Sequence, residues 1–164
     1  IKKLESEGIK FYDSRDEMQN FLNHFQKLEK LEWTLNQDIP HPDGIKPTRM
    51  PFEQWKKVVL DFYNNSYGVD IVAVKDGDYI GATDIEVYPK SEPHKGWTGG
   101  LGVIQEFRRK GIATALKIKA IKALLKKGVT EVRTDNEENN PMYKINVALG
   151  FKPVPFSLEY IKEI

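Results

Sequence analysis

Hydrophobic positions three and four residues apart recur in four segments of the chain and predict four helices. The first follows the capping-box pattern Ser14–Glu17 and carries apolar residues up to Leu28. The second begins at Pro51, a residue suited to a first helical turn. The third and strongest spans residues 112–127 and is followed by a glycine, and a short fourth helix spans residues 141–149.

Alternating and continuous apolar runs between these helices predict the strands. A short strand occupies residues 9–12, and two strands within residues 70–87 flank the turn Lys75–Asp78, which has the composition of a hairpin turn. Further strands occupy residues 97–104 and 129–134. The three glycines of the first of these indicate a bulge or a ligand close to the backbone. This order of elements predicts a mixed α/β fold.

Composition narrows the class of protein. The 164 residues fit one domain, and 40% hydrophobic with 30% charged residues is typical of a globular chain. A net charge of +1 gives no overall field to attract nucleic acid or an anionic membrane, and no apolar segment is long enough to span a bilayer. The absence of cysteine excludes disulfides, thiolate zinc sites and a cysteine nucleophile, and favours a cytoplasmic protein.

The segment VIQEFRRKGIATALK, residues 103–117, places a basic turn where the third helix begins. A helix start has four backbone N–H groups without intrahelical partners and about half a positive charge. Gly111 lets an oxygen atom approach the backbone, and Arg108, Arg109 and Lys110 add positive charge. The pattern predicts a diphosphate site, with a merely solvated basic turn as the alternative.

Two motifs resemble the GNAT superfamily of acyl-CoA-dependent N-acetyltransferases. RRKGIA, after a strand that ends at Val103, is similar to the family signature Arg/Gln-x-x-Gly-x-Gly/Ala, and NNPMYKINVALGF, residues 139–151, is similar to its second motif. The resemblance implies a central, mostly antiparallel mixed sheet flanked by helices. It also implies a single domain over residues 1–164, or one half of a tandem protein, with acetyl-CoA as the co-substrate. Because the chain begins with Ile1 rather than Met, it could be a processed product or a piece of something longer.

The resemblance also implies which residues hold the cofactor. In this family a glycine-rich strand splays from its neighbour and the acyl-pantetheine arm lies in the opening, which places Leu101, Gly102 and Val103 beside the arm. The helix start would hold the diphosphate, and Asn139 would contact the cofactor near the second motif. The residues implied for the diphosphate are Arg108, Arg109, Lys110, Gly111, Ile112, Ala113 and Thr114.

Acetyl transfer to an amine requires a neutral amine, a polarised thioester carbonyl and a proton for the leaving thiolate. The resemblance implies that the backbone N–H of Val103 is the donor to the carbonyl. Asn146 stands where many members have a Tyr acid, and an amide cannot act as an acid at neutral pH. Asn146 could instead position the thiol or a water, and Tyr143, one helical turn earlier, is the substitute acid. Direct transfer without an acyl-enzyme is expected, because no nucleophile is evident.

Asp84 and Glu86 are the candidate general bases. They alternate with apolar residues and therefore share one face of their strand, with a solvated outer face as the alternative. Asp135 and a water-mediated base are further options. The three histidines lack the spacing of metal ligands, so no metal is expected, and His24 is interpreted as structural or solvated.

These observations predict an N-acetyltransferase that acts on a primary amine of a small molecule, with a peptide or protein amine as the second choice. The alternative is a non-catalytic CoA-binding regulatory or structural module, which Asn146 favours. Neither a nucleic-acid nor a membrane partner is expected, and a second GNAT domain or a homodimer remains an alternative. The irregular loop at residues 37–49 is expected to line an acceptor pocket, and some of the tryptophans could join it.

Overall fold

The computed structural model describes residues 1–15, 17, 21–39, 46–65, 67–135 and 141–154. The chain forms two compact units, residues 1–134 and residues 135–164, and each is described by itself. The first unit contains the whole sheet and four of the described α-helices. In the described residues no helix is long and apolar enough to cross a membrane.

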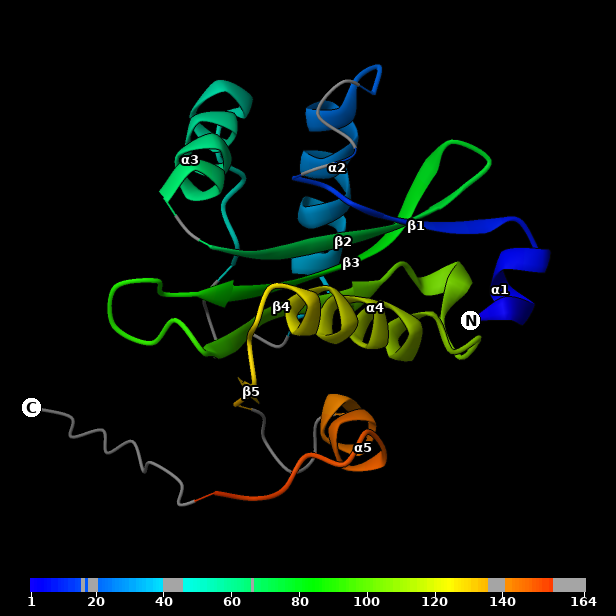
Figure 1. Ribbon diagram of the computed structural model, residues 1–164. Coiled ribbons are helices and arrows are strands. Elements are labelled where there is room, and N and C mark those ends of the chain that lie inside the picture. Colours follow the sequence, from blue (N-terminus) through cyan, green and yellow to red (C-terminus); the bar gives the residue numbers. More distant parts are fainter. Residues whose placement is uncertain (16, 18–20, 40–45, 66, 136–140, 155–164) are drawn as a thin grey trace, which may run out of the picture. The chain divides into compact units, whose positions relative to one another are not determined.

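Five strands form one sheet in the order β1-β2-β3-β4-β5 (Figure 1). Neighbouring strands from β1 to β4 are antiparallel to one another, and β5 runs parallel to β4. Their bounds are Ile9–Asp13 for β1, Tyr67–Lys75 for β2, Asp78–Val87 for β3, Lys95–Val103 for β4 and Glu131–Arg133 for β5. The expected mixed, mostly antiparallel sheet flanked by helices is thereby confirmed.

One face of the sheet is covered by α4, Ile112–Lys126 (Figure 1). Its apolar positions point into a core that also takes the odd-numbered residues of β2, such as Val69 and Ile71, and Ile85 of β3. Leu116 and Leu124 of α4 are almost fully buried there. The short helix α1, Lys2–Ser6, adds Leu4 to the same core.

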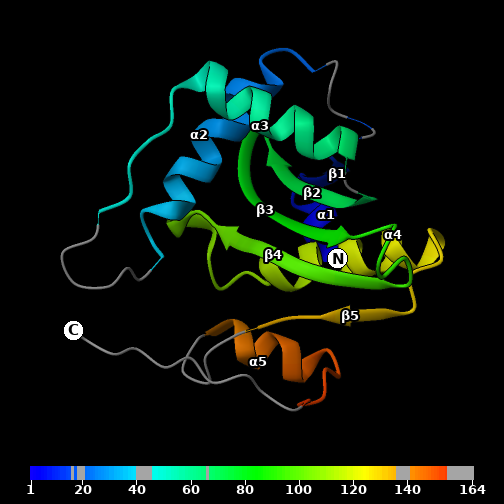
Figure 2. The same cartoon turned by 90° about the vertical axis from the view of Figure 1, so that its left-hand side faces the viewer.

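The opposite face is covered by α2, His24–Asn36, and α3, Phe52–Asn65 (Figure 2). A second apolar cluster lies between these helices and the sheet, and its buried members are Leu28, Leu31, Val72 and Tyr79. Because side chains alternate along a strand, the even-numbered residues of β2 and those of β3 from Ala82 onward face α2 and α3. This face therefore carries Asp70, Asp84 and Glu86.

The β2–β3 hairpin contains an irregularity that sets its register. Asp76 and Gly77 form a two-residue turn with φ of 50° and 85°, as the sequence predicts. The pairing then shifts by one residue at Ala73 and Val74. Because of this shift, Asp70 lies opposite Asp84 instead of Thr83.

The first helix begins nine residues later than a Ser14 cap predicts. α2 starts at His24, and Ser14 does not cap it but lies fully buried beside β1. Asp13 takes the capping role in a local turn: its backbone N–H donates to the Glu17 carboxylate at 2.7 Å, and its carboxylate accepts the Arg15 N–H at 3.0 Å. Residues 16 and 18–20, part of the predicted helix, lie outside the described residues.

The remaining predicted elements agree closely with the structure. α3 begins directly after Pro51, whose carbonyl accepts the N–H of Trp55 at 3.0 Å. Gly128, with φ of 86°, follows the end of α4. In the second unit α5 spans Pro141–Ala148, and Gly150, with φ of 88°, follows it.

Candidate functional site

The edge of β4 is the first feature of the site. β5 pairs with β4 only at Lys95, Gly96 and Trp97. Just beyond, the Thr98 hydroxyl donates to Thr134 Oγ1 at 2.7 Å. In the part of the chain that the structure describes, no strand continues this pairing, so the edge of β4 beyond Thr98 is not paired with a strand on that side.

The pairing of β4 with β3 shows which backbone groups lie along this unpaired edge. The N–H of Ile104 donates to the Ile80 carbonyl at 3.0 Å. The backbone N–H and C=O groups of Ile104 and Gly102 therefore point toward β3. In an antiparallel pair the backbone groups of alternate residues point away from the partner strand, so those of Leu101 and Val103 point toward the unpaired edge of β4. Arg108 Nε bonds the Val103 carbonyl at 2.8 Å, which leaves the Val103 N–H as a donor at this edge.

The basic turn before α4 is exposed and strongly curved. Arg109 and Gly111 both adopt left-handed backbone conformations, with φ of 59° and 83°. The side chains of residues 108–110 are exposed, whereas the Ile112 side chain is buried in the core. Ile112 can therefore take part in anion binding only through its backbone.

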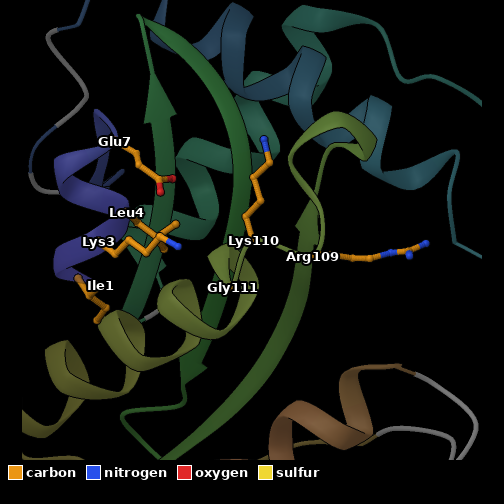
Figure 3. Close-up of a pocket in the computed structure, with 7 residues that line it drawn as sticks. All are labelled: Ile1, Lys3, Leu4, Glu7, Arg109, Lys110 and Gly111. Atoms are coloured by element: carbon orange, nitrogen blue, oxygen red, sulfur yellow. The ribbon is translucent and has the colours of Figure 1, made fainter.

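Arg108 is held by polar groups of the protein, whereas the Lys110 ammonium lies over the Phe107 ring, 4.9 Å from its centre. The Arg108 guanidinium bonds the Val103 carbonyl and forms an ion pair with Asp38, and its backbone N–H donates to the Gln105 carbonyl at 3.2 Å. Its side chain thus connects the end of β4 to the segment after α2. Figure 3 shows the exposed side chains of Arg109 and Lys110 projecting from the turn.

The first helical hydrogen bond of α4 runs from the Ala115 N–H to the Gly111 carbonyl, at 3.0 Å. The N–H groups of Ile112, Ala113 and Thr114 precede this bond and have no intrahelical acceptor. No side chain caps this end, and a Cβ placed on Gly111 would meet nothing within 4 Å. The helix start thus presents open N–H donors beside Arg109 and Lys110.

A pocket of about 580 Å³ adjoins this turn. Figure 3 shows α1 on one side of it and the start of α4 on the other, with the side chains of Lys3 and Glu7 directed between them. Arg109 extends away from α1. The turn therefore presents its two open cations in different directions, with Lys110 on the α1 side.

The glycines of β4 make room for side chains of neighbouring elements. A register shift opposite Asp84 forms a bulge at Gly99 and Gly100, and a Cβ at Gly99 would lie 1.9 Å from the Asp84 carboxylate. The Gly100 N–H donates to Asp84 Oδ1 at 2.7 Å. At Gly102 a Cβ would meet Leu35 of α2 at 2.8 Å. The predicted bulge is present, and these contacts give a packing reason for the glycines.

Asp84 is half-buried rather than fully solvated. Burial raises the pKa of its carboxyl group, while the Gly100 N–H acts in the opposite direction. Glu86, two residues along, is also half-buried, and its carboxylate accepts the Tyr88 hydroxyl at 2.9 Å. The two candidate bases share a face, as the sequence predicts, and Asp84 is the one attached to β4.

Two further carboxyl groups lie near Asp84 and were not singled out in the sequence. Burial raises the pKa of Asp70 to about 7, and the nearby Asp84 charge adds to this rise. Desolvation also raises the pKa of Glu32 on α2 to about 7, with Asp70 and Asp84 contributing, although Glu32 keeps contact with water, which limits desolvation. The Trp55 Nε1–H donates to Glu32 at 2.8 Å.

The cations of this region balance only part of this negative charge. Arg49 binds Glu29 through two hydrogen bonds of 2.7 and 2.6 Å, which lowers the pKa of Glu29. Arg15 lies close enough to lower the pKa of both Asp70 and Asp84. We call Glu32, Asp70, Asp84 and Glu86 the acidic group. Its carboxylates belong to α2, β2 and β3 and lie on one face of the sheet.

The second-motif residues belong to the second unit. Asn146 is buried, with 4% of its surface exposed. Its backbone carbonyl accepts the backbone N–H groups of Leu149 and Phe151 at 3.1 and 3.0 Å. Tyr143 is half-buried and Asp135 is exposed. Asn139 lies outside the described residues. The roles of these residues stay predictions.

No group of His, Asp and Glu side chains with the arrangement of a metal site occurs in the described residues. His24 is buried and hydrogen-bonded to Ser14 and Tyr79, at 3.1 and 2.9 Å, which agrees with its structural interpretation. Trp55 packs against the second apolar cluster and donates its Nε1–H to Glu32 of the acidic group.

Solved structures with the same fold include several acetyltransferases. The complex of AAC(6')-Iy with the bisubstrate analogue CoA-S-monomethyl-acetylneamine has a TM-score of 0.68 and 19% identity, covering 95% of this chain and 99% of that one. The aminoglycoside 6'-N-acetyltransferase AAC(6')-IG from Acinetobacter haemolyticus has a TM-score of 0.63 and 17% identity, with 95% and 98% covered. A transcriptional regulator from Bacillus halodurans has a TM-score of 0.70 and 14% identity, with 94% and 99% covered. At these identities the likeness shows the fold.

The sequence itself identifies the family. It matches the acetyltransferase (GNAT) family over residues 25–149, while a search of curated proteins gave no match. This match begins at the second residue of α2 and ends just beyond α5, so it includes the first motif and the second as far as Leu149. The chain therefore belongs to the GNAT acetyltransferase family and is an acyltransferase.

Proposed function

We propose that this protein transfers an acetyl group from acetyl-CoA directly to a primary amine of a small cationic molecule. One observation carries the proposal. The hydrogen bond of 2.7 Å between the Gly100 N–H and Asp84 attaches a candidate base to the strand whose other edge is open. The proton acceptor is thus bound to Gly100, three residues before Val103, whose N–H is the proposed donor to the carbonyl.

The residues on the cofactor side fit acetyl-CoA. The open edge of β4 offers backbone groups of Leu101 and Val103 to an extended arm with amide groups of its own. The open N–H groups at the start of α4, with Arg109 and Lys110, suit a diphosphate. Bound acetyl-CoA would supply a thioester carbonyl carbon that an amine can attack and a thiolate that can leave.

On the acceptor side, the acidic group favours a cation. Amines at neutral pH are mostly protonated, and the carboxylates of Glu32, Asp84 and Glu86 retain contact with solvent. Their negative charge would attract and orient an ammonium group. A molecule with more than one ammonium group fits this arrangement better than a single amine. Among the structural neighbours, one metagenomic aminoglycoside acetyltransferase was solved with sisomicin, and aminoglycosides accordingly belong in the first panel of acceptors.

The chain's own residues would contribute to the transfer in three ways. Asp84 accepts a proton from the ammonium nitrogen, which turns the acceptor into a nucleophile. The Val103 N–H donates to the thioester oxygen as negative charge develops there, which lowers the barrier. A proton for the leaving thiolate would come from Tyr143 or from a water held by Asn146.

Thiol release measured with acetyl-CoA and a panel of amines tests the proposal. The panel contains aminoglycosides, linear diamines, matched monoamines and a lysine peptide. Turnover with diamines or aminoglycosides well above that with monoamines supports the proposed acceptor. CoA binding by calorimetry without turnover on any amine would contradict it and favour the non-catalytic CoA-binding module.

Two variants address the proton donor to the thiolate. If Tyr143 supplies the proton, Tyr143→Phe lowers turnover while Asn146→Ala changes it less. The reverse result assigns the step to a water held by Asn146. Unchanged rates in both variants would remove these residues from the mechanism.

A further inference from the structure

Asp70 on β2 and Asp84 on β3 lie opposite each other in the sheet, and both side chains are on the face that α2 and α3 cover. Only Asp84 is open enough to meet an acceptor, because Asp70 keeps 8% of its surface exposed. Residues directly opposite in an antiparallel pair have Cβ atoms about 5 Å apart. At that separation, in a partly buried site, the charge of one carboxylate raises the proton affinity of the other.

A chain of buried hydrogen bonds holds Asp70 in place. The Tyr63 hydroxyl donates to Asp70 Oδ2 at 2.5 Å and lies 2.8 Å from the Ser14 hydroxyl. Ser14 in turn bonds His24 Nε2 at 3.1 Å, and His24 Nδ1 bonds the Tyr79 hydroxyl at 2.9 Å. The Ser14 N–H also donates to the Asp70 carbonyl at 2.6 Å.

The donors of this chain run in one direction. Because Tyr63 gives its only hydroxyl hydrogen to Asp70, its oxygen accepts from Ser14. Ser14 then accepts from His24 Nε2–H, and His24 Nδ1 accepts from Tyr79. This order requires a neutral His24, and burial lowers the pKa of His24 accordingly. Every donor in the chain therefore points toward the Asp70 carboxylate and stabilises its negative charge.

We propose that Asp70 is a positioning residue that acts through Asp84: its carboxylate, held by the chain from Tyr79 to Tyr63, strengthens Asp84 as the base. The proposal rests on the proposed acetyl transfer. In that step an N–H bond of the ammonium group breaks, an O–H bond forms on Asp84, and Asp70 keeps its own charge. The proton later passes from Asp84 to solvent.

Other charges face this pair from each surrounding element. Asp13 lies on β1 and Arg15 just after it, Glu32 lies on α2, and Glu86 lies beside Asp84 on β3. Asp13 disfavours the Asp70 anion and Arg15 favours it. None of these groups is changed by the substitutions below, so their effects are common to all variants compared.

The test compares the pH dependence of kcat/KM in two variants, one that removes the Asp70 charge and one that destabilises it. Asp70→Asn removes the neighbouring charge, so Asp84 becomes a weaker base and the acidic limb moves to lower pH by about one unit. Tyr63→Phe removes the hydrogen bond that stabilises the Asp70 anion, so Asp70 takes up a proton more readily, the charge beside Asp84 is reduced and the limb also moves to lower pH. Asp61→Asn, an exposed change on α3, is the control and leaves the limb in place.

A titration of ¹³C-labelled aspartate carboxyl groups, followed by NMR without any amine, tests the coupling independently of turnover. In Asp84→Asn the pKa of Asp70 falls, and in Asp70→Asn the pKa of Asp84 falls. A limb that stays in place or moves to higher pH in Asp70→Asn, or Asp84 titrating identically with and without Asp70, would overturn the proposal. If these pKa shifts appear but no amine is acetylated, the coupling stands and the proposed function fails. If Asp70→Asn does not fold, Tyr63→Phe and Asp84→Asn decide the question.

Discussion

Asp84 is the single side chain on which the proposed transfer depends most directly. Asp84→Asn keeps the shape of the side chain and its ability to accept the Gly100 N–H, but removes the base. We expect kcat to fall by about 10²- to 10⁴-fold, the usual contribution of a general base. CoA affinity, measured by calorimetry, stays the same because the cofactor residues lie elsewhere on β4 and α4. Asp61→Asn is the matched control, and an equal loss of activity in both variants would count against Asp84.

Gly111 tests the anion site at the start of α4. Gly111→Asp places a negative charge beside the open N–H groups, and we expect the Kd for CoA to rise roughly tenfold or more, equivalent to about 1.4 kcal/mol. Gly111→Asn carries the same backbone strain, since φ is 83°, but no charge, so it separates repulsion from strain. Gly128→Asp has a matching φ of 86° at the other end of α4. Calorimetry that gives all three variants the same CoA affinity would refute the anion site.

Some residues of the candidate site could be predicted from the sequence and others could not. The basic turn and the shared face of Asp84 and Glu86 could be predicted, because both follow from local spacing. Asp70 could not, because its position opposite Asp84 depends on the register shift at Ala73 and Val74. A regular hairpin from the turn at Asp76 would have put Thr83 there instead. A bulge is decided by packing across strands, which leaves little trace in the local sequence.

β4 is the element that joins the candidate base to the open edge, and its bulge can be tested as a unit. In Gly99→Ala the new Cβ would lie 1.9 Å from the Asp84 carboxylate, so Asp84 must move. We expect turnover to fall about tenfold or more, because small displacements of catalytic groups are costly. Gly100→Ala is the matched control: its Cβ would lie 3.4 Å from Asp84, which the carboxylate can accommodate. Equal turnover in the two variants, measured by thiol release, would show that the bulge does not position Asp84.

The first predicted helix shows why element boundaries are harder to predict than elements. The capping-box pattern at Ser14 has the right composition, but Ser14 is recruited by His24 and Tyr63, which are distant in sequence. The true start at His24 follows Asn23 in a left-handed conformation, with no side-chain cap. Long-range contacts thus overrode a local signal. By contrast, the boundaries of α4 could be predicted, because a left-handed glycine stands at each end of it.

At the scale of the whole molecule, the buried ionisable groups make folding stability depend on pH. Asp70 has a pKa of about 7 in the folded state and 3.8 in the unfolded state, so the folded state binds more protons between these values. Its contribution to the free energy of unfolding is therefore complete below pH 4 and is lost as the pH rises to about 7. Lys117 acts in the opposite direction at higher pH: burial lowers its pKa to about 8, so its destabilising effect disappears as the pH rises from 8 to 10.5.

Urea unfolding of the wild type and Asp70→Asn between pH 4 and pH 8 isolates the Asp70 contribution. We expect the stability of the wild type relative to the variant to fall by roughly 4 kcal/mol across this range, since each unit of pKa shift is worth about 1.4 kcal/mol. Most of the fall should occur below pH 7, and the difference should be constant above it. His24, whose lowered pKa has the reverse effect below pH 6.5, is present in both proteins and largely cancels. A difference that does not vary with pH would mean that Asp70 ionises as freely in the folded protein as in the unfolded chain, and the buried chain of hydrogen bonds would then offset the whole cost of burying its charge.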